Sequence, residues 1–140
     1  MRRSRRLPDY DYSSNGAYFI TIATFDRRPI LVDEAKAIVD SELHALPDRF
    51  PGLSIDIAMI MPDHLHTILI LSESKAAIPR IVQAFKSLTT RKVKAAFSTD
   101  RVWQRSYYDR VIRNEQELQA VRDYIQSNPV VHAVRVERTS

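Results

Sequence analysis

Two strand-like runs separated by only two residues constrain the fold of this chain more than any other feature. Residues 53–61 (LSIDIAMIM) and 64–71 (HLHTILIL) are rich in β-branched and large apolar side chains, and Pro62 and Asp63 between them form a turn signal. Strands joined by so short a connection pair antiparallel. We therefore expect a β-hairpin in the middle of the chain, with the rest of the fold built around it.

On the N-terminal side of this hairpin, a strand and then a helix are predicted. The β-branched and aromatic run at 17–25 reads as the strand. Asp33 is a candidate N-cap for a helix over 34–46, in which apolar residues recur at helical spacing. Pro47 and the turn residues that follow it are expected to end this helix.

On the C-terminal side, a helix, a strand and a further helix are predicted. The helix begins at Pro79 and the strand covers 102–112. Asn114 and Glu117 approximate a capping box at the start of the last helix. Pro129 is expected to end it, because the residue before a proline avoids the α region.

The resulting order is βαββαβ followed by an extra helix. We expect an α+β fold, a ferredoxin-like or RRM-like βαββαβ sandwich with an additional C-terminal helix. The length of 140 residues favours a single domain over 1–140, with residues 1–12 forming a basic, flexible N-terminal arm. Such a sandwich has many functions, so the function must be argued from a site.

Composition excludes several classes of protein. There is no cysteine, which rules out a disulfide scaffold, a zinc ribbon and a thiol nucleophile. No apolar run approaches the ~20 residues of a membrane span, and the basic start is not followed by an apolar signal core. We expect a cytoplasmic protein with no membrane partner.

Charge is unevenly distributed, although the net charge is only +4. Residues 33–50 carry five carboxylates, whereas 74–113 carry ten basic side chains and only two acidic ones, interleaved with aromatic residues. Clustered cations and rings are typical of a nucleic-acid surface. A solvated helix face with core aromatics explains the same pattern, and charge alone does not separate the two.

Two histidines on the second strand of the hairpin form a candidate metal site. His64 and His66 are two residues apart, so both project from one face of the strand, and Asp63 precedes them. Two imidazoles at that spacing can bind one divalent cation. The alternative is a pair of half-buried histidines that only form hydrogen bonds.

Tyr124 and Asn128 share one face of the last helix, because they are four residues apart. Tyr124 lies at the border of the apolar stripe, where its hydroxyl can reach a cleft. The Asn128 amide oxygen is a hard ligand suited to Mg²⁺ or Mn²⁺. A boundary tyrosine and a helix-ending asparagine are the simpler explanation of this helix taken alone.

In combination, these motifs resemble the HUH single-strand transposases, and more closely the REP-associated tyrosine transposases (RAYT proteins). The resemblance runs from about residue 5 to 130 and rests on segments in a matching order and spacing: Leu7-Pro-Asp-Tyr-Asp-Tyr12, Gly16-Ala-Tyr-Phe-Ile-Thr-Ile22, Met61-Pro-Asp-His-Leu-His66, Phe85-Lys-Ser87, Val102-Trp-Gln-Arg-Ser-Tyr-Tyr108, Arg113-Asn-Glu115 and Asp123-Tyr-Ile-Gln-Ser-Asn-Pro129.

The resemblance implies the HUH endonuclease fold and a site. His64 and His66 correspond to metal ligands, Asn128 to a third polar ligand, and Tyr124 to the nucleophile. It also implies a divalent cation, Mg²⁺ or Mn²⁺, and cleavage of single-stranded DNA near a palindromic hairpin through a 5′-phosphotyrosine.

Candidate contacts to the DNA backbone come from the basic second half of the chain. They are Lys86, Arg91, Lys94, Arg105 and Arg110. A monomer is favoured over a dimer because nothing in the sequence marks a self-association face, although relatives use both arrangements.

Three alternatives stay open at this point. The first is a non-catalytic RRM-like module that binds single-stranded nucleic acid by base stacking, with structural histidines. The second is a domesticated HUH nickase that retains the site. The third keeps the enzyme but makes Tyr107 or Tyr108 the nucleophile.

Overall fold

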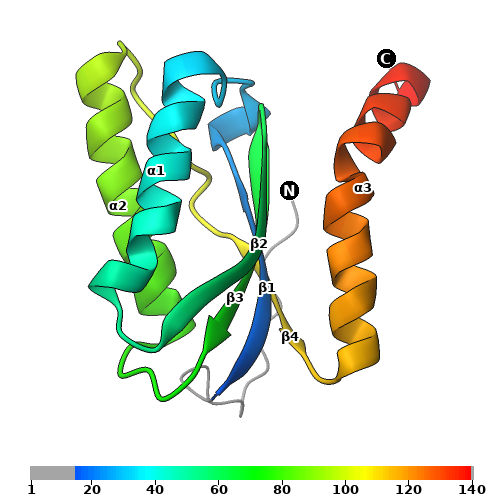
Figure 1. The fold of residues 1–140 in the computed structure, drawn as a ribbon. Coiled ribbons are helices and arrows are strands. Elements are labelled where there is room, and N and C mark those ends of the chain that lie inside the picture. The colour runs from blue at the N-terminus through cyan, green and yellow to red at the C-terminus, as the bar shows by residue number, and fades with distance from the viewer. Residues whose placement is uncertain (1–14, 140) are drawn as a thin grey trace.

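A computed structural model describes the backbone of residues 15–139 and the side chains of residues 15–127. The basic arm expected at residues 1–12 lies outside the described residues. The elements are β1 (Gly16–Ala23), the short 3-10 helix η1 (Phe25–Arg27), α1 (Asp33–Arg49), β2 (Leu53–Met61), β3 (His64–Leu71), α2 (Ile78–Ala96), β4 (Tyr108–Ile112) and α3 (Glu115–Thr139). Figure 1 shows their arrangement.

The four strands form one antiparallel sheet in the order β2-β3-β1-β4. This order confirms the predicted α+β sandwich, because each βαβ unit is split by a strand of the other. The hairpin is also confirmed: Met61 pairs with His64 across the two-residue turn at Pro62 and Asp63.

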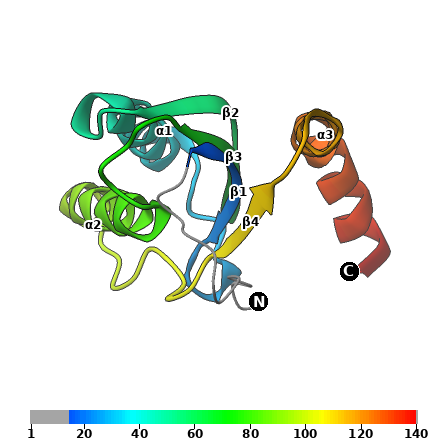
Figure 2. The ribbon, with the colours of Figure 1, turned by 90° about the horizontal axis from the view of Figure 1, so that it is seen from below.

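Helices cover both faces of the sheet, α1 and α2 on one side and α3 on the other (Figure 2). Side chains alternate between these faces along each strand. On β3, Leu65 and Leu69 join the core under α1 and α2, whereas Ile68 joins a second cluster with Val121 and Ile125 of α3. The two faces are therefore separate environments.

The apolar face and one ion pair hold α3 on the sheet. Val121 and Ile125 pack on Phe19 and Ile68. A β-bulge between Ile55 and Ile57 leaves Asp56 outside the ladder. There its carboxylate accepts two hydrogen bonds from Arg122 of α3, at 2.8 and 2.7 Å.

The start of α3 is built as predicted. The Asn114 side chain accepts a hydrogen bond from the backbone N–H of Glu117, at 2.8 Å. The Glu117 carboxylate in turn accepts one from the backbone N–H of Arg113, also at 2.8 Å. The Asn114 side chain thus satisfies an N–H group of the first turn, and the Glu117 carboxylate binds the residue before the cap.

Three predicted helix boundaries are wrong. Asp33 is not the N-cap of α1, because it is the first helical residue and Val32 occupies the cap position. Helix α1 continues through Pro47 to Arg49, and α3 continues through Pro129 to Thr139. A proline disfavours the α region at the preceding residue without excluding it.

The predicted strand at 102–112 is too long. Its regular part is β4, and the segment before it pairs with the end of β1 through one isolated bridge, between Trp103 and Thr24, without forming a ladder. Side chains of α2 hold this segment instead: the Trp103 indole N–H donates to Thr89 Oγ1 at 2.8 Å, and the Lys86 ammonium donates to the Gln104 and Arg105 carbonyls at 2.6 and 3.0 Å. The predicted strand at 17–25 likewise ends early, at Ala23, because Phe25 begins η1.

No described helix combines the length and apolar character needed to cross a membrane.

The ion pair between Asp56 and Arg122 predicts a pH dependence of stability. The hydrogen bond from Arg122 is the largest effect on the pKa of Asp56 and, with its charge, lowers that pKa below the ordinary value despite partial burial. A group with a depressed folded-state pKa stabilises the fold above its unfolded pKa, ~3.9 for aspartate, and loses that contribution as the pH falls toward the folded pKa.

We expect the melting temperature of Asp56→Asn to lie below that of the wild type at neutral pH and to approach it as the pH falls from about 5 to about 2. Thermal melts followed by circular dichroism measure this. Asp48→Asn, which changes an exposed carboxylate on α1, serves as the control. A constant difference between Asp56→Asn and wild type across this range would contradict the assignment.

Candidate active site

His64 and His66 lie side by side at the start of β3, on the face that α3 covers. Their ring centroids are 4.7 Å apart, and the residues are only 6% and 5% exposed. The register pairs His64 with Ala23 and His66 with Thr21 on β1. The strand spacing therefore brings the two imidazoles together as the sequence predicted.

Each imidazole makes a hydrogen bond through its Nδ1 atom. His64 Nδ1 lies 2.7 Å from a carboxylate oxygen of Asp63, and His66 Nδ1 lies 2.8 Å from the hydroxyl oxygen of Thr21. Burial raises the pKa of Asp63, but the hydrogen bond from His64 and the charge of Arg27 outweigh it, so that the pKa is lowered overall. Asp63 is thus an ionised acceptor at neutral pH.

Tyr124 brings a phenol from α3 to the same place. Its ring centroid is 5.6 Å from that of His66 and 6.2 Å from that of Phe19, both edge-on. The residue is 39% exposed, so part of it stays open to solvent. The structure thus juxtaposes a phenol with the two buried imidazoles.

Asn128 follows Tyr124 by four residues, about one turn further along α3. Its side chain lies outside the described residues. Among residues 15–127, no group of three or more His, Cys, Asp or Glu side chains could hold a metal ion. The two imidazoles suit a divalent cation, and a complete site needs another ligand, such as an amide, water or a phosphate oxygen.

The other two candidate tyrosines, Tyr107 and Tyr108, occupy different surroundings. Tyr107 is 7% exposed and packs in the core under α1 and α2. Tyr108 is half-buried and its ring lies edge-on to Phe19, at 6.0 Å. Tyr124 is more exposed than Tyr107 and contacts the His66 ring, which favours it as the reactive phenol.

The position of α3 also bears on the RRM-like alternative. Stacking of bases on a sheet requires aromatic side chains on an open sheet face. Here Val121 and Ile125 pack against Phe19, which is 8% exposed. On the sheet face opposite α1 and α2, helix α3 therefore covers Phe19, so a base cannot stack on this ring as the RRM-like alternative requires.

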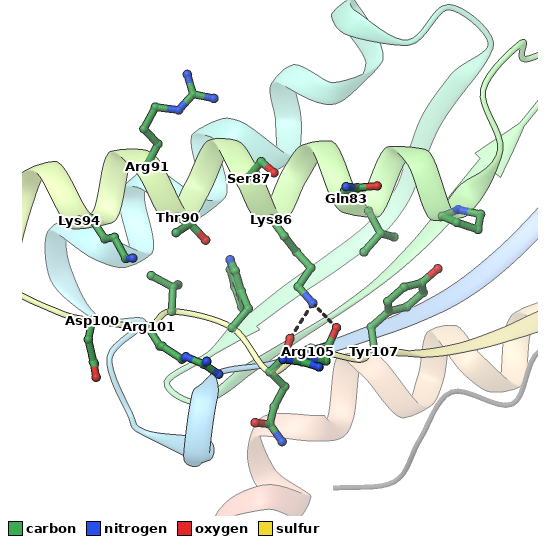
Figure 3. A pocket seen from close by; sticks show the side chains of 15 residues that line it. Gln83, Lys86, Ser87, Thr90, Arg91, Lys94, Asp100, Arg101, Arg105 and Tyr107 are labelled. Carbon is green, nitrogen blue, oxygen red and sulfur yellow. Dashed lines mark hydrogen bonds between the residues drawn. The ribbon is translucent and has the colours of Figure 1, made fainter.

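A basic groove of about 820 Å³ runs between α2 and the segment 100–107 (Figure 3). Four of the five predicted DNA contacts line it: Lys86, Arg91, Lys94 and Arg105. In Figure 3, Lys86 and Lys94 point from α2 toward the segment, whereas Arg91 lies at the rim and points away from it. Arg101 also lines the groove, a cation that the sequence reasoning did not select.

Two of the predicted contacts have other partners. Burial lowers the pKa of Lys86, whose ammonium holds the two backbone carbonyls of the segment. Arg110 lies on the opposite side of the sheet from the groove, since it pairs with Phe19 across the strands and lies 3.5 Å from Glu117 of α3.

The sequence reasoning noted Asp63 but missed Thr21 and Arg27. Thr21 meets His66 only because β1 and β3 pair in one particular register. The Arg27 guanidinium reaches the second carboxylate oxygen of Asp63, at 3.1 Å from Nη2. Asp63, next to His64 in the sequence, was the one local signal that the histidines have hydrogen-bond partners.

Comparison with known proteins agrees with this geometry. A family model described as "Transposase IS200 like" matches residues 12–128. An uncharacterised protein of Haemophilus influenzae is 30% identical, with 93% of this chain and 89% of that protein covered. A REP-associated tyrosine transposase of Escherichia coli K12 is 25% identical, with 86% of this chain and 70% of that protein covered.

A solved structure of a REP-associated tyrosine transposase bound to a REP hairpin has the same fold. It superposes with a TM-score of 0.78 at 24% identity, covering 94% of this chain and 74% of the other. The predicted HUH-type fold is thereby confirmed. Because the family model matches residues 12–128 and a relative that is 30% identical is covered over 89% of its length, the chain belongs to the IS200-like transposase family, as its RAYT-like motifs predicted.

Proposed function

We propose that this protein cuts and rejoins single-stranded DNA next to a hairpin, with Tyr124 as the nucleophile. The observation that carries the proposal is the contact between the Tyr124 ring and the buried histidine pair, at 5.6 Å from His66. Membership of the IS200-like transposase family supports the same reaction class. A relative solved with a REP hairpin suggests a palindromic hairpin as the DNA partner.

The chemical step is a transesterification. The Tyr124 Oη atom attacks the scissile phosphorus in line, a new O–P bond forms, and the bond from phosphorus to the 3′ oxygen breaks. The phenolic proton is lost to solvent or a base, and the leaving 3′ oxygen takes up a proton. The products are a 5′-phosphotyrosine and a free 3′-OH. Because the phosphodiester is preserved, a 3′-OH can reverse the step without ATP.

His64 and His66 are proposed to hold a divalent cation, Mg²⁺ or Mn²⁺, with Asn128 as a third ligand. Such a cation would polarise the phosphoryl oxygens and offset transition-state charge. The chain's own residues position the reactants: the strand fixes both imidazoles, and the packing of α3 holds the phenol against them. This contact within one chain supports attack by the tyrosine of the same subunit.

The basic groove is proposed to bind the DNA backbone away from the reacting phosphate. The cations there come from Arg91, Lys94 and Arg105. Lys86 holds the segment that carries Arg105 by its hydrogen bond to the Arg105 carbonyl. Arg110 lies on the side of the sheet that α3 covers, and is proposed to contact the strand closer to Tyr124. Phosphate contacts of this kind give affinity that falls with salt.

Tyr124→Phe removes one oxygen and should abolish cleavage. Incubation with hairpin-bearing single-stranded DNA and Mg²⁺ or Mn²⁺, followed by a denaturing gel, measures the covalent protein–DNA adduct. We expect the adduct to fall at least about a thousandfold, since the nucleophile is lost. Binding of the same DNA should be unchanged.

Tyr108→Phe is the matched control, because it removes the same atom from a tyrosine on the same sheet face. It should retain the adduct. Adduct formation by Tyr124→Phe would sink the assignment, and DNA binding by the wild type without any adduct would favour a non-catalytic binding module.

His64→Ala and His66→Ala should each remove the dependence of cleavage on divalent cations. Each deletes an imidazole ligand, and we expect activity at saturating metal to drop by more than about 100-fold. The measurement is a Mn²⁺ titration of the cleavage rate. His44→Ala, an exposed histidine on α1, is the control. Wild-type metal dependence in either variant would refute the ligand role.

Replacement of Arg91, Lys94 and Arg105 by alanine should weaken DNA binding and its salt dependence together. For single-stranded DNA the slope of log affinity against log salt should fall by about 0.7 for each phosphate that the variant no longer neutralises. Fluorescence anisotropy at several salt concentrations measures this. Lys36→Ala, an exposed cation on α1, should leave the slope unchanged. An unaltered slope in the triple variant would place the DNA elsewhere.

A further inference from the structure

We infer that Asp63 and Thr21 are positioning residues that fix the tautomer and orientation of the two histidines. In this arrangement Nδ1 of each ring carries the hydrogen and Nε2 carries the lone pair. The inference deepens the proposed function, because the Nε2 lone pairs are what a cation would bind. It assigns a role to two side chains that neither touch the proposed cation nor react.

For His64, the Asp63 carboxylate decides which ring nitrogen carries the hydrogen. An ionised carboxylate only accepts hydrogen bonds, so the 2.7 Å contact between His64 Nδ1 and Asp63 Oδ1 requires a hydrogen on Nδ1. In the neutral ring the lone pair is then on Nε2. Neutral imidazole in water prefers the opposite tautomer, so the carboxylate changes the state of this ring.

Arg27 anchors Asp63 in that position. The two carboxylate oxygens are divided: Oδ1 faces His64, whereas Oδ2 accepts from Arg27 Nε and Nη2 at 3.3 and 3.1 Å. Asp26 and Arg27 have φ values of 57° and 53°. Residues other than glycine rarely adopt this left-handed backbone, so the turn that carries Arg27 to Asp63 has an unusual conformation.

The turn that carries Asp63 is tied to the end of β1 as well. The Asp63 carbonyl accepts hydrogen bonds from the backbone N–H of Thr24 at 3.0 Å and from the Thr24 hydroxyl at 3.1 Å. Thr24 is fully buried. The carboxylate therefore projects from a backbone that two hydrogen bonds from Thr24 hold in place, so the fold sets the position from which it faces His64.

For His66 the partner is a hydroxyl, which can donate or accept. Thr21 Oγ1 lies 2.8 Å from His66 Nδ1, and the two residues face each other in the β1–β3 register. We assign Thr21 as the acceptor on the strength of the proposed function, since only then is the Nε2 lone pair available to a cation. Hydrogen bonds from the second ring nitrogen are the usual way in which proteins orient metal-binding histidines.

The test is the tautomeric state of both rings in metal-free protein, together with Mn²⁺ affinity. Long-range ¹H–¹⁵N spectra at about pH 8, above the ~6.5 of an unperturbed histidine, identify which nitrogen carries the hydrogen. The wild type should show Nδ1–H for His64 and His66. Asp63→Ala should convert His64 to Nε2–H, and Thr21→Val, nearly isosteric, should do the same to His66.

Calorimetric titration with Mn²⁺ supplies the second readout. Asp63→Ala and Thr21→Val should each bind Mn²⁺ about 10- to 100-fold more weakly than wild type. Thr21→Ser keeps an acceptor and should retain the Nδ1–H signal of His66. Asp63→Asn should convert His64 to Nε2–H, because Arg27 takes the one remaining oxygen and leaves the amide NH₂ facing Nδ1. Asp40→Asn is the matched control, because Asp40 and His44 form an exposed Asp–His pair on α1, at 3.4 Å.

Wild-type tautomers in Asp63→Ala and Thr21→Val would overturn the inference. So would a loss of Mn²⁺ affinity without a change of tautomer, because the two residues would then act through packing alone. If the wild type bound no Mn²⁺ and formed no DNA adduct, the proposed function would fail. The tautomers of the metal-free protein would still decide the inference about Asp63 and His64.

Discussion

The packing of α3 on the sheet is the contact on which the rest of the site depends. Val121 and Ile125 bury apolar surface against Phe19 and Ile68, and Arg122 binds the Asp56 carboxylate. Tyr124 lies on this same helix, so its contact with His66 exists only while the helix is docked. Because burial of apolar side chains is favourable and non-directional, the ion pair at the bulge gives the docking its orientation.

The two-residue period of the strands separates two tasks. One face of β3 contributes Leu65 and Leu69 to the core under α1 and α2, beyond which the basic groove lies. The other face presents His64 and His66 toward α3. The sheet thus separates the groove proposed to bind the DNA backbone from the groups proposed to react. Strand β4 and the segment before it run from the groove to the reacting groups. Arg105 and Arg110, on opposite sides of the sheet, lie on that connection.

Local sequence signals predicted what depends on local chemistry. The turn at Pro62 and Asp63, the capping box at Asn114 and the shared strand face of the two histidines all follow from spacing within a few residues. The bulge at Asp56 and the contact of Thr21 with His66 depend on strand register, which a single sequence does not reveal. The segment before β4 looked like a strand because it contains the β-branched and aromatic residues Val102, Trp103 and Tyr107. These residues are buried, but α2 side chains, not a ladder, hold the segment. Helices α1 and α3 both continue past a proline, at Pro47 and at Pro129, which a proline rule applied to the sequence does not foresee.

Mapping the peptide that becomes linked to DNA tests the central claim most directly. Trypsin separates the candidates, since residues 123–135 contain Tyr124 alone, whereas 106–110 contain Tyr107 and Tyr108. Mass spectrometry of the digested adduct should find the nucleotide on residues 123–135, attached to Tyr124 through a phosphodiester. A nucleotide on residues 106–110 would contradict the account, because the attacking phenol would then come from β4 or the segment before it and not from the helix that contacts His66.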